Sequence, residues 1–313
     1  MTVLGIHHVT AIAGDAQENV NFYAGVLGMR LVKRSVNQDD PGTYHFFYAD
    51  AAGHPGTDLT FFPWGHMGPG RLGAGLIWEV ALAVPPGSLA FWRRRLGEAQ
   101  VKMGEPTTRF DERVLPVTDP HGQALVLVET GDARDFTPWD KSPIPLDAQI
   151  RRLHGVRMVE QDGGATGRAL EQLLGYVPQG DEAGWRRFRV GEGGSGRVLD
   201  VREAPDTPRG RWGRGTVHHV AFRVPDDAAQ AEARARVAAA GLRPTPVIDR
   251  FWFRSVYFLE PGGVLFELAT DGPGFAVDED PAHLGERLVL PPWLEPERAV
   301  IEAALPPLRY PPM

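Results

Sequence analysis

The 313-residue chain contains no cysteine, which excludes disulfide bonds, cysteine-ligated zinc sites and thiol nucleophiles. A metal site in this chain must therefore use histidine nitrogens and carboxylate oxygens as ligands. Positive charge is also in deficit, because the formal net charge is −7 and the pI is about 5.8. Without a basic field to hold phosphates, neither nucleic acid nor an anionic membrane is an expected partner, and a small molecule is favoured.

Long apolar runs are missing as well. No stretch of about 18 apolar residues exists, and the start MTVLGIHH lacks a basic segment followed by an apolar one, so we expect no membrane span and no signal peptide. We therefore place the protein in the cytoplasm. Apolar residues make up 42% of the chain and charged residues 23%, which is typical of a folded globular protein of about two domains.

The chain repeats one pattern four times, over residues of about 3–64, 75–130, 151–204 and 215–271. Each segment opens with an alternating strand, continues with a helix, and closes with further strands around a glycine turn. In the first segment, Asp15 with Glu18 marks a helix start and Gly28 its end. The last hairpins of the second and fourth segments, DPHGQALVLVE and SVYFLEPGGVLFELATD, are alike. The pattern predicts four βαβββ modules.

We predict an α+β fold in which these modules pair into two cup-shaped sheets, because a small sheet covered by a helix on one face must bury or use its other face. Residues 1–140 would form an N-terminal half and residues 141–272 a C-terminal half, joined by the polar linker GDARDFTPWDKSPIPLDAQ. Residues 273–313 are rich in proline and are expected to wrap over the body, with a short helix near Glu295 to Ala304.

A histidine pair occurs at the same place in the first and fourth modules, in GIHHVTAI and TVHHVAFRV. Because side chains alternate along a strand, one histidine of each pair faces the cup, and His8 and His219 are the candidates. Glu267 stands alone in the apolar last strand of the fourth module. Modules one and four would then combine two imidazoles and a carboxylate in one cup, which predicts a metal site.

The internal alignment explains why the second cup is not expected to bind a metal. The positions equivalent to the two histidines are Glu79 and Gly155, and Gly155 offers no ligand. The positions equivalent to Glu267 hold Val126, Asp200, and in the first module Phe61 or Thr60. Glu79 and Asp200 are then remnants of a lost site or simple polar contacts. The remaining histidines are predicted to be turn or surface residues: His45, His54, His66, His121, His154 and His283.

Three protein ligands with no fourth ligand at the remaining position leave coordination sites open. Two histidines and one carboxylate in this arrangement suit Fe(II) that binds substrate and oxygen together. Mn(II) takes the same ligand set, so the sequence leaves the choice between the two metals open.

At this point the sequence resembles the vicinal oxygen chelate (glyoxalase/bleomycin resistance/extradiol dioxygenase) superfamily, and within it the Fe(II) ring-cleaving dioxygenases that act on hydroquinones, including chlorinated ones. The resemblance covers nearly the whole chain. It rests on GIHHVTAIAGDAQENVNFYAGVLGMRLVKRSVNQDDPGTYHFFYAD, HPGTDLTFFPW, the ligand strands GTVHHVAFRV and LFELATD, and the tail DEDPAHLGERLVLPPWLEPERAVIEAALPPL.

The resemblance implies that the iron ligands are His8, His219 and Glu267. It further implies a surrounding catalytic shell of Arg250, Tyr257, His218, His7 and Thr10. A phenol and a guanidinium can hold a hydroquinone oxygen as phenolate, and a histidine near iron could pass protons. The implied reaction is of the extradiol type: both atoms of O2 enter the ring next to a hydroxyl-bearing carbon, and an open-chain acid or acyl halide results.

Two alternatives stay open from the sequence. A metal-dependent isomerase or transferase of the glyoxalase kind shares the expected fold but would close the metal site with a fourth protein ligand, which Phe61 or Thr60 makes difficult. A protein that binds an aromatic or a drug in the cup without turnover would need no metal. The sequence also leaves open which hydroquinone, alkylated or chlorinated, is preferred, and whether the chain forms a homo-oligomer.

Overall fold

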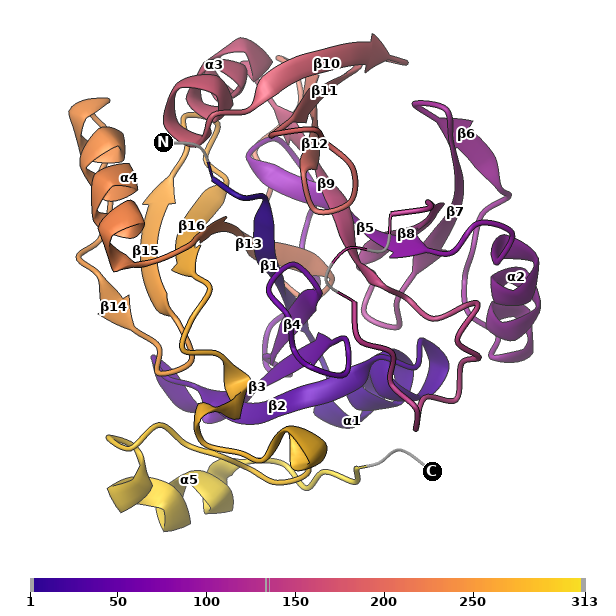
Figure 1. Ribbon diagram of the computed structural model, residues 1–313, viewed down its shortest axis with the longest axis vertical. Coiled ribbons are helices and arrows are strands. Elements are labelled where there is room, and N and C mark those ends of the chain that lie inside the picture. The colour runs from indigo at the N-terminus through magenta and orange to yellow at the C-terminus, as the bar shows by residue number, and fades with distance from the viewer. Residues whose placement is uncertain (1–2, 133, 135, 311–313) are drawn as a thin grey trace.

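The computed structural model describes residues 3–132, 134 and 136–310, and every predicted site residue lies within them. The four predicted modules are confirmed (Figure 1). The first comprises β1 (Ile6–Ala13), α1 (Ala16–Val20), β2 (Arg30–Asn37), β3 (Asp40–Ala49) and β4 (Asp58–Pro63). The second comprises β5 (Leu76–Val84), α2 (Leu89–Glu98), β6 (Thr107–Arg109), β7 (Glu112–Thr118) and β8 (Ala124–Glu129).

The second half of the chain repeats this order. The third module comprises β9 (Arg152–Glu160), α3 (Gly163–Ala169), β10 (Val177–Glu182), β11 (Trp185–Arg189) and β12 (Val198–Glu203). The fourth comprises β13 (Thr216–Val224), α4 (Asp227–Ala239), β14 (Ile248–Asp249), β15 (Arg254–Leu259) and β16 (Leu265–Thr270). Short 3₁₀ turns follow at Phe275–Val277, Pro281–His283 and Glu295–Glu297, and α5 (Arg298–Ala304) confirms the short helix predicted in the tail.

The helix of the first module begins and ends where the sequence predicts. The Asp15 side chain accepts a hydrogen bond from the Glu18 amide at 2.8 Å, and Gly28 follows the helix with a φ of +68°. Between them α1 widens into a π-helical turn at Asn21–Val26. This turn is not evident in the sequence. It lets three consecutive side chains, from Phe22 to Ala24, all be buried, which exceeds the stripe of a regular α-helix.

The described strands form two sheets of eight strands each. One has the order β14-β15-β16-β13-β1-β4-β3-β2, and the other has the order β10-β11-β12-β9-β5-β8-β7-β6. The first sheet joins modules one and four, and the second joins modules two and three, as predicted. At each centre an antiparallel pair connects the two modules, β1 with β13 and β5 with β9. The boundaries of the two predicted halves stay a prediction, since each sheet takes one module from each half.

The two concave faces differ in their lining, and we name them by it. The histidine cup is the inner face of the first sheet and carries His8 and His219, whereas the arginine cup is the inner face of the second and carries Arg157 and Arg187. One large hydrophobic core with residues from all four modules fills the space behind both sheets. The helices α1, α2, α3 and α4 lie on the outside (Figure 1). Both cups are therefore held on a shared rigid core.

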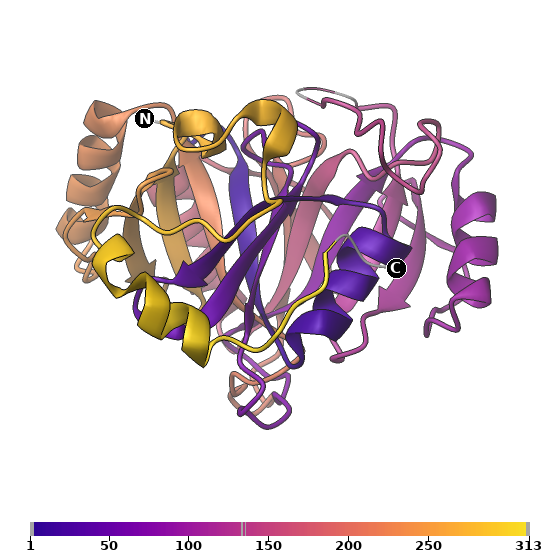
Figure 2. The same cartoon turned by 90° about the horizontal axis from the view of Figure 1, so that it is seen from below.

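The tail packs against the histidine cup. It runs across the strands β2 and β3 (Figure 2), and Val289 donates its amide to the Arg34 carbonyl at 3.0 Å. Phe275 from the tail joins a buried cluster with Phe47 inside this cup. Lys33 of β2 is fully buried and donates to the Phe275 carbonyl at 3.0 Å, to Asp278 at 2.7 Å and to the Glu279 carboxylate. The buried ion pairs fix the tail, so the predicted wrap is part of the cup wall.

Candidate metal centre

Strand register places the three predicted ligands on one face at the middle of the first sheet. In the antiparallel pair of β1 and β13, His8 lies opposite Ala221, and Thr10 lies opposite His219. In the parallel pair of β13 and β16, Ala221 lies beside Glu267. Residues opposite each other share a face of the sheet. Side chains far apart in the sequence therefore converge.

The three ligand atoms form a compact triangle. His8 Nε2 is 3.2 Å from His219 Nε2 and 3.2 Å from Glu267 Oε2, and His219 Nε2 is 2.9 Å from the same oxygen. All three residues are buried, with Glu267 completely shielded from solvent. The group is also the one set of three or more such residues in the described chain whose ligand atoms lie close enough to share a metal ion.

The spacing fits one ion held on a triangular face. Two ligands at about 2.1 Å from a metal and at right angles to each other are about 3.0 Å apart, against about 3.4 Å at a tetrahedral angle. The observed edges of 2.9 to 3.2 Å match the right-angle arrangement. Glu267 Oε2 has no hydrogen-bond partner in the described part of the chain although it is fully buried. A cation at this point would satisfy it.

The protonation states suit a metal. Burial alone would raise the pKa of Glu267, but the imidazoles of His8 and His219 hold that pKa well below its usual value. Burial lowers the pKa of His219, with Glu267 opposing this shift. A carboxylate beside a neutral imidazole is the donor set that divalent ions require.

His7 and His218 each lie at a register shift in the pairing of β1 with β13, so the strict alternation that would turn them away from the metal face does not hold there, and each contacts its neighbouring ligand. His7 Nδ1 lies 2.9 Å from His8 Nδ1, and His218 Nδ1 lies 2.8 Å from His219 Nδ1. Burial is the main cause that lowers the pKa of His7, and it lowers the pKa of His218 to about 3. A neutral partner at Nδ1 fixes the tautomer of the ligand imidazole and leaves Nε2 free for a metal.

The fourth equivalent position of the histidine cup is Thr60. Register puts Thr60 beside Thr10 in the parallel pair of β1 and β4, just as Glu267 lies beside Ala221. Its hydroxyl lies 2.7 Å from Thr10 Oγ1, which in turn lies 2.9 Å from His219 Nε2. A neutral hydroxyl that is already hydrogen-bonded is a weak ligand, so the metal face stays three-coordinate on the protein side.

Tyr257 and Arg250 reach the same cup from the β15 side. Tyr257 lies opposite Glu267 in the pair of β15 and β16. Burial, and then the charge of Glu267, raise the pKa of the Tyr257 phenol, so it keeps its proton at neutral pH. The Arg250 guanidinium lies 5.6 Å from the centre of the Tyr257 ring and forms a bidentate ion pair with Asp39 at 2.8 and 3.2 Å.

A pocket opens in front of the triad. Its polar side chains include both histidine ligands, Tyr257 and Arg250. Its walls are aromatic and comprise Phe47, Phe62, Trp252 and Phe253. Such a combination of flat apolar walls with a few polar groups is typical of a site for a small aromatic molecule.

Two of the histidines that the sequence predicted at turn or surface positions lie elsewhere in the structure. His45 lies on β3 and lines this cavity, and His154 lies buried on β9. The prediction of turn or surface positions is wrong for both, because an isolated histidine in a strand gives no local signal of the face it occupies. Ser255 was also missed: its hydroxyl donates to Glu267 Oε1 at 2.5 Å and orients the carboxylate.

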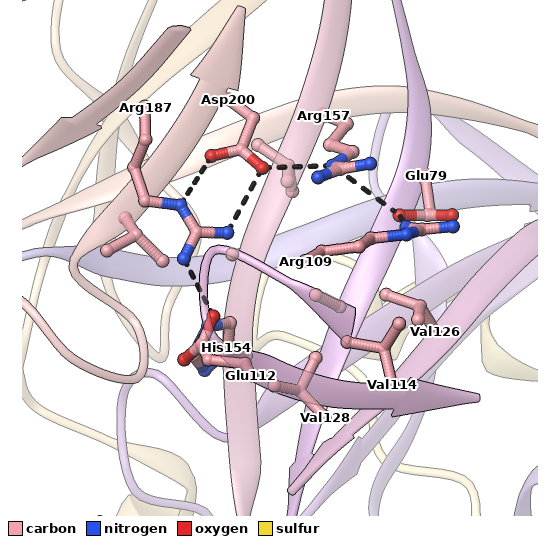
Figure 3. Close-up of a pocket in the computed structure, with 14 residues that line it drawn as sticks. Glu79, Arg109, Glu112, Val114, Val126, Val128, His154, Arg157, Arg187 and Asp200 are labelled. Atoms are coloured by element: carbon pink, nitrogen blue, oxygen red, sulfur yellow. Dashed lines mark hydrogen bonds and ion pairs between the residues drawn. The ribbon is translucent and has the colours of Figure 1, made fainter. Parts of the chain in front are cut away.

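The arginine cup holds ion pairs at the corresponding place (Figure 3). Arg187 contacts Asp200 at 2.7 Å and Glu112 at 2.7 Å, and Arg157 contacts Asp200 at 2.9 Å. Glu79 is paired with Arg109 at 2.6 Å. Each carboxylate already has a cationic partner, so the polar-contact interpretation of Glu79 and Asp200 agrees with the structure.

Paired βαβββ modules that curl around a candidate metal centre define the class of vicinal oxygen chelate folds. The comparison with known families agrees. A family model described as the Glyoxalase/Bleomycin resistance protein/Dioxygenase superfamily matches residues 5–127 and 155–268, and the chain belongs to this superfamily.

In the described part of the chain, no helix is long and apolar enough to cross a membrane.

The similar proteins include ring-cleaving dioxygenases by name. The "Putative ring-cleaving dioxygenase MhqO" of Bacillus subtilis is 42% identical over 96% of this chain and 96% of its own. The "Chlorohydroquinone/hydroquinone 1,2-dioxygenase" of Sphingobium indicum is 35% identical over 94% of this chain and 93% of its own.

Solved structures confirm the fold. A crystal structure of a "putative dioxygenase" from Bacillus subtilis is 42% identical, covers 100% of this chain and 99% of its own, and superposes with a TM-score of 0.92. Glyoxalase I from Zea mays covers 85% of this chain and 92% of its own with a TM-score of 0.64, and at 15% identity it supports the fold alone.

Proposed function

We propose that the protein is a ring-cleaving dioxygenase that binds Fe(II) through His8, His219 and Glu267. The substrate is a hydroquinone-type ring, and both atoms of O2 enter it next to a hydroxyl-bearing carbon. The observation that carries the proposal is the buried triangle of two imidazole nitrogens and one carboxylate oxygen, with edges of 2.9 to 3.2 Å, facing an aromatic cavity. The names of the relatives support the same reaction class.

The bound metal would supply the redox chemistry that a protein side chain cannot provide. Fe(II) is favoured over Mn(II) because two histidines, one carboxylate and open positions are typical of Fe(II) oxygenases, although Mn(II) accepts the same ligands. His7, His218 and Ser255 orient the three ligands through the contacts described above.

The remaining residues bind and orient the substrate. The protonated Tyr257 phenol can donate a hydrogen bond to a substrate oxygen, and the Arg250 cation beside it favours that oxygen as phenolate. The aromatic walls hold the ring by stacking and exclude water from it. Thr10 lies against the metal face, where its hydroxyl can exchange a hydrogen bond with a bound substrate or O2.

The test uses protein reconstituted with Fe(II) without air, followed by addition of oxygenated buffer with hydroquinone, methylhydroquinone or catechol. We expect one O2 consumed per ring, both oxygen atoms of ¹⁸O₂ in the product, and new ultraviolet absorbance from the opened ring. Turnover of catechol alone would keep the reaction class and correct the substrate.

Absence of O2 uptake with every diphenol, in protein that holds one iron per chain, would overturn the proposal. The alternatives are then a glyoxalase-type isomerase or transferase, or a binding protein. The position of Thr60, a neutral and hydrogen-bonded side chain where a fourth ligand would stand, disfavours the isomerase. Metal analysis of protein purified without air tests the binding protein, which would need no metal.

A further inference from the structure

His45 occupies a place in the histidine cup that neither the metal triad nor its supporting residues use. It lies on β3 and lines the cavity together with His8, His219 and Tyr257. Its ring packs against Phe47 at 3.9 Å and Phe62 at 4.4 Å between ring centres. An imidazole held flat among aromatic walls has a fixed orientation, which is the requirement for directional hydrogen bonding to a ligand.

One nitrogen of this imidazole is occupied and the other is not. His45 Nε2 lies 3.0 Å from Thr60 Oγ1, whose hydroxyl continues to Thr10 at 2.7 Å. Nδ1 has no hydrogen-bond partner in the described residues. It is also not one of the fully buried atoms without a partner, so it is accessible from outside the protein. It is therefore open to the cavity. A neutral imidazole carries one donor and one acceptor nitrogen, so Nδ1 remains available to a ligand hydroxyl, which can both donate and accept.

His45 and Tyr257 stand on opposite wings of the curled sheet. The strand order runs β15-β16-β13-β1-β4-β3, with Tyr257 on β15 at one end and His45 on β3 at the other. The candidate metal ligands lie between them, on β16, β13 and β1. The cavity thus offers polar groups at two separated ends with aromatic walls between them. A 1,4-diol carries its two oxygens at opposite ends of a rigid ring, whereas a 1,2-diol carries both at one end.

We propose that His45 hydrogen-bonds the second hydroxyl of a 1,4-diol, the one remote from Tyr257, and so selects hydroquinones against ring substrates without a para hydroxyl. This inference rests on the proposed function, because it assumes that the ring enters the cavity with one oxygen at the triad. Burial, and then the charge of His8, hold the pKa of His45 well below its usual value, which keeps the imidazole neutral at the pH of the assay.

The test compares two ligands that differ only at the para position, hydroquinone and 4-methylphenol. Their dissociation constants are measured by calorimetry with the Fe(II)-loaded protein in the absence of oxygen. We expect the wild type to prefer hydroquinone by about tenfold or more, since a neutral hydrogen bond in a buried site is worth about this factor. The His45→Phe variant keeps the aromatic packing and is expected to lose the preference.

Two further variants separate the nitrogens of the ring. His45→Asn keeps a polar atom near Nδ1, and His45→Gln keeps one near Nε2, where it can still contact Thr60. If His45 Nδ1 binds the second hydroxyl, His45→Asn will retain part of the preference and His45→Gln will lose it. The opposite order, or equal weakening of both ligands in every variant, would show that His45 only supports Thr60 and would overturn the inference.

Failure of the proposal for His45 can be distinguished from failure of the proposed function. If wild-type protein consumes O2 with hydroquinone while His45→Phe keeps the same ligand preference, the selective role of His45 is wrong and the dioxygenase stands. If the preference depends on His45 but no O2 is consumed, the binding role stands and the reaction is wrong. Iron content is measured in each variant, and equal content is expected because His45 contacts none of the three ligands.

Discussion

The histidine cup and the arginine cup are built from equivalent strands but carry different side chains at equivalent positions. Strand register makes His8 equivalent to Gly155, His219 to Glu79, Glu267 to Val126 and Thr60 to Asp200. In the arginine cup, the carboxylates of Glu79, Glu112 and Asp200 are each paired with a guanidinium (Figure 3). In the histidine cup, Glu267 is surrounded by imidazoles and keeps an unsatisfied oxygen. A buried carboxylate that stays ionised without a guanidinium partner therefore marks a site where the counter-charge has to come from outside the chain.

The backbone explains why the arginine cup has no ligand at one position. A Cβ atom at Gly155 would lie 2.6 Å from the Val198 carbonyl oxygen, which real side chains do not tolerate. A histidine there would have to displace the neighbouring strand β12. A cluster of three valines lines the pocket in front of Gly155 together with the ion pairs, at Val114, Val126 and Val128. The candidate metal site therefore lies in one copy of the structure, and the network of ion pairs lies in the other.

Exchange of Glu267 for an uncharged isostere removes the only carboxylate among the three candidate ligands. We expect Glu267→Gln to weaken Fe(II) binding by at least about 100-fold and to abolish O2 uptake, since loss of outer-shell contacts alone costs 10- to 100-fold. Glu79→Gln, the matched change in the arginine cup, should leave iron content unchanged. Iron per chain after anaerobic loading and desalting is the measurement. An equal iron content in the Glu267→Gln and Glu79→Gln variants would contradict a metal site in the histidine cup.

A second change removes the central cation of the arginine cup. Arg187→Met leaves Asp200 and Glu112 without their main partner, and breaking a buried pair costs about 3 kcal/mol or more of unfolding free energy. The exposed neighbour Arg186→Met is the control and should change stability by less than about 0.5 kcal/mol. Urea unfolding measures both. A loss of iron without a loss of stability would mean that the two cups do not divide these roles.

Glu160, at the end of β9, shows a third way to accommodate a buried carboxyl. Burial, and then the charge of Glu260, raise its pKa to about 8, above an unfolded value near 4.5. Between these pH values the folded state keeps a proton that the unfolded state has lost, so the unfolding free energy falls as pH rises from 5 to 8.

Glu160→Gln removes this dependence. Relative to wild type, the variant should gain on the order of 3 kcal/mol between pH 5 and pH 8, as measured by urea unfolding at both pH values. Parallel pH profiles for the two proteins would show that Glu160 is ionised in the fold.

His218 supports the ligand His219 through a contact at Nδ1, and its loss is expected to have a smaller effect than the changes above. His218→Phe keeps a ring against Trp212, which stacks on His218 at 4.4 Å, but removes the contact to His219 Nδ1. We expect Fe(II) affinity to fall by about 10- to 100-fold with little change in stability. A competition assay with a metal chelator measures it. Unchanged affinity combined with a lower kcat would instead assign His218 a role in the reaction.

Much of this comparison can be predicted from the sequence because the modules repeat. Once two repeats are aligned, a period of two residues along each strand decides which side chains share a face. Thr10 is correctly placed with His8, but a register shift between Ile6 and His8 breaks the alternation at His7, whose ring contacts that of His8. The linker is polar as predicted, but Ile144 and Ala148 within it are buried against the core, so it is a packed connection.

Other parts depend on contacts that no local pattern encodes. His45 occurs once in a strand with aromatic residues on both sides, and only the curl of the sheet brings it to the cavity. The tail carries no periodic signal, and its attachment depends on the buried Lys33, a residue type that ordinarily lies at the surface. The ion pairs of Arg187 join the neighbouring strands β11 and β12 to β7, where Glu112 lies 75 positions earlier in the sequence.

Anomalous diffraction at the iron edge, from crystals of protein loaded with Fe(II) without air, would locate the metal in one cup or the other. We predict one peak per chain, between His8 Nε2, His219 Nε2 and the Glu267 carboxylate, and none in the arginine cup. A peak among Glu79, Asp200 and their neighbours, or no peak in either cup at full iron concentration, would contradict this prediction.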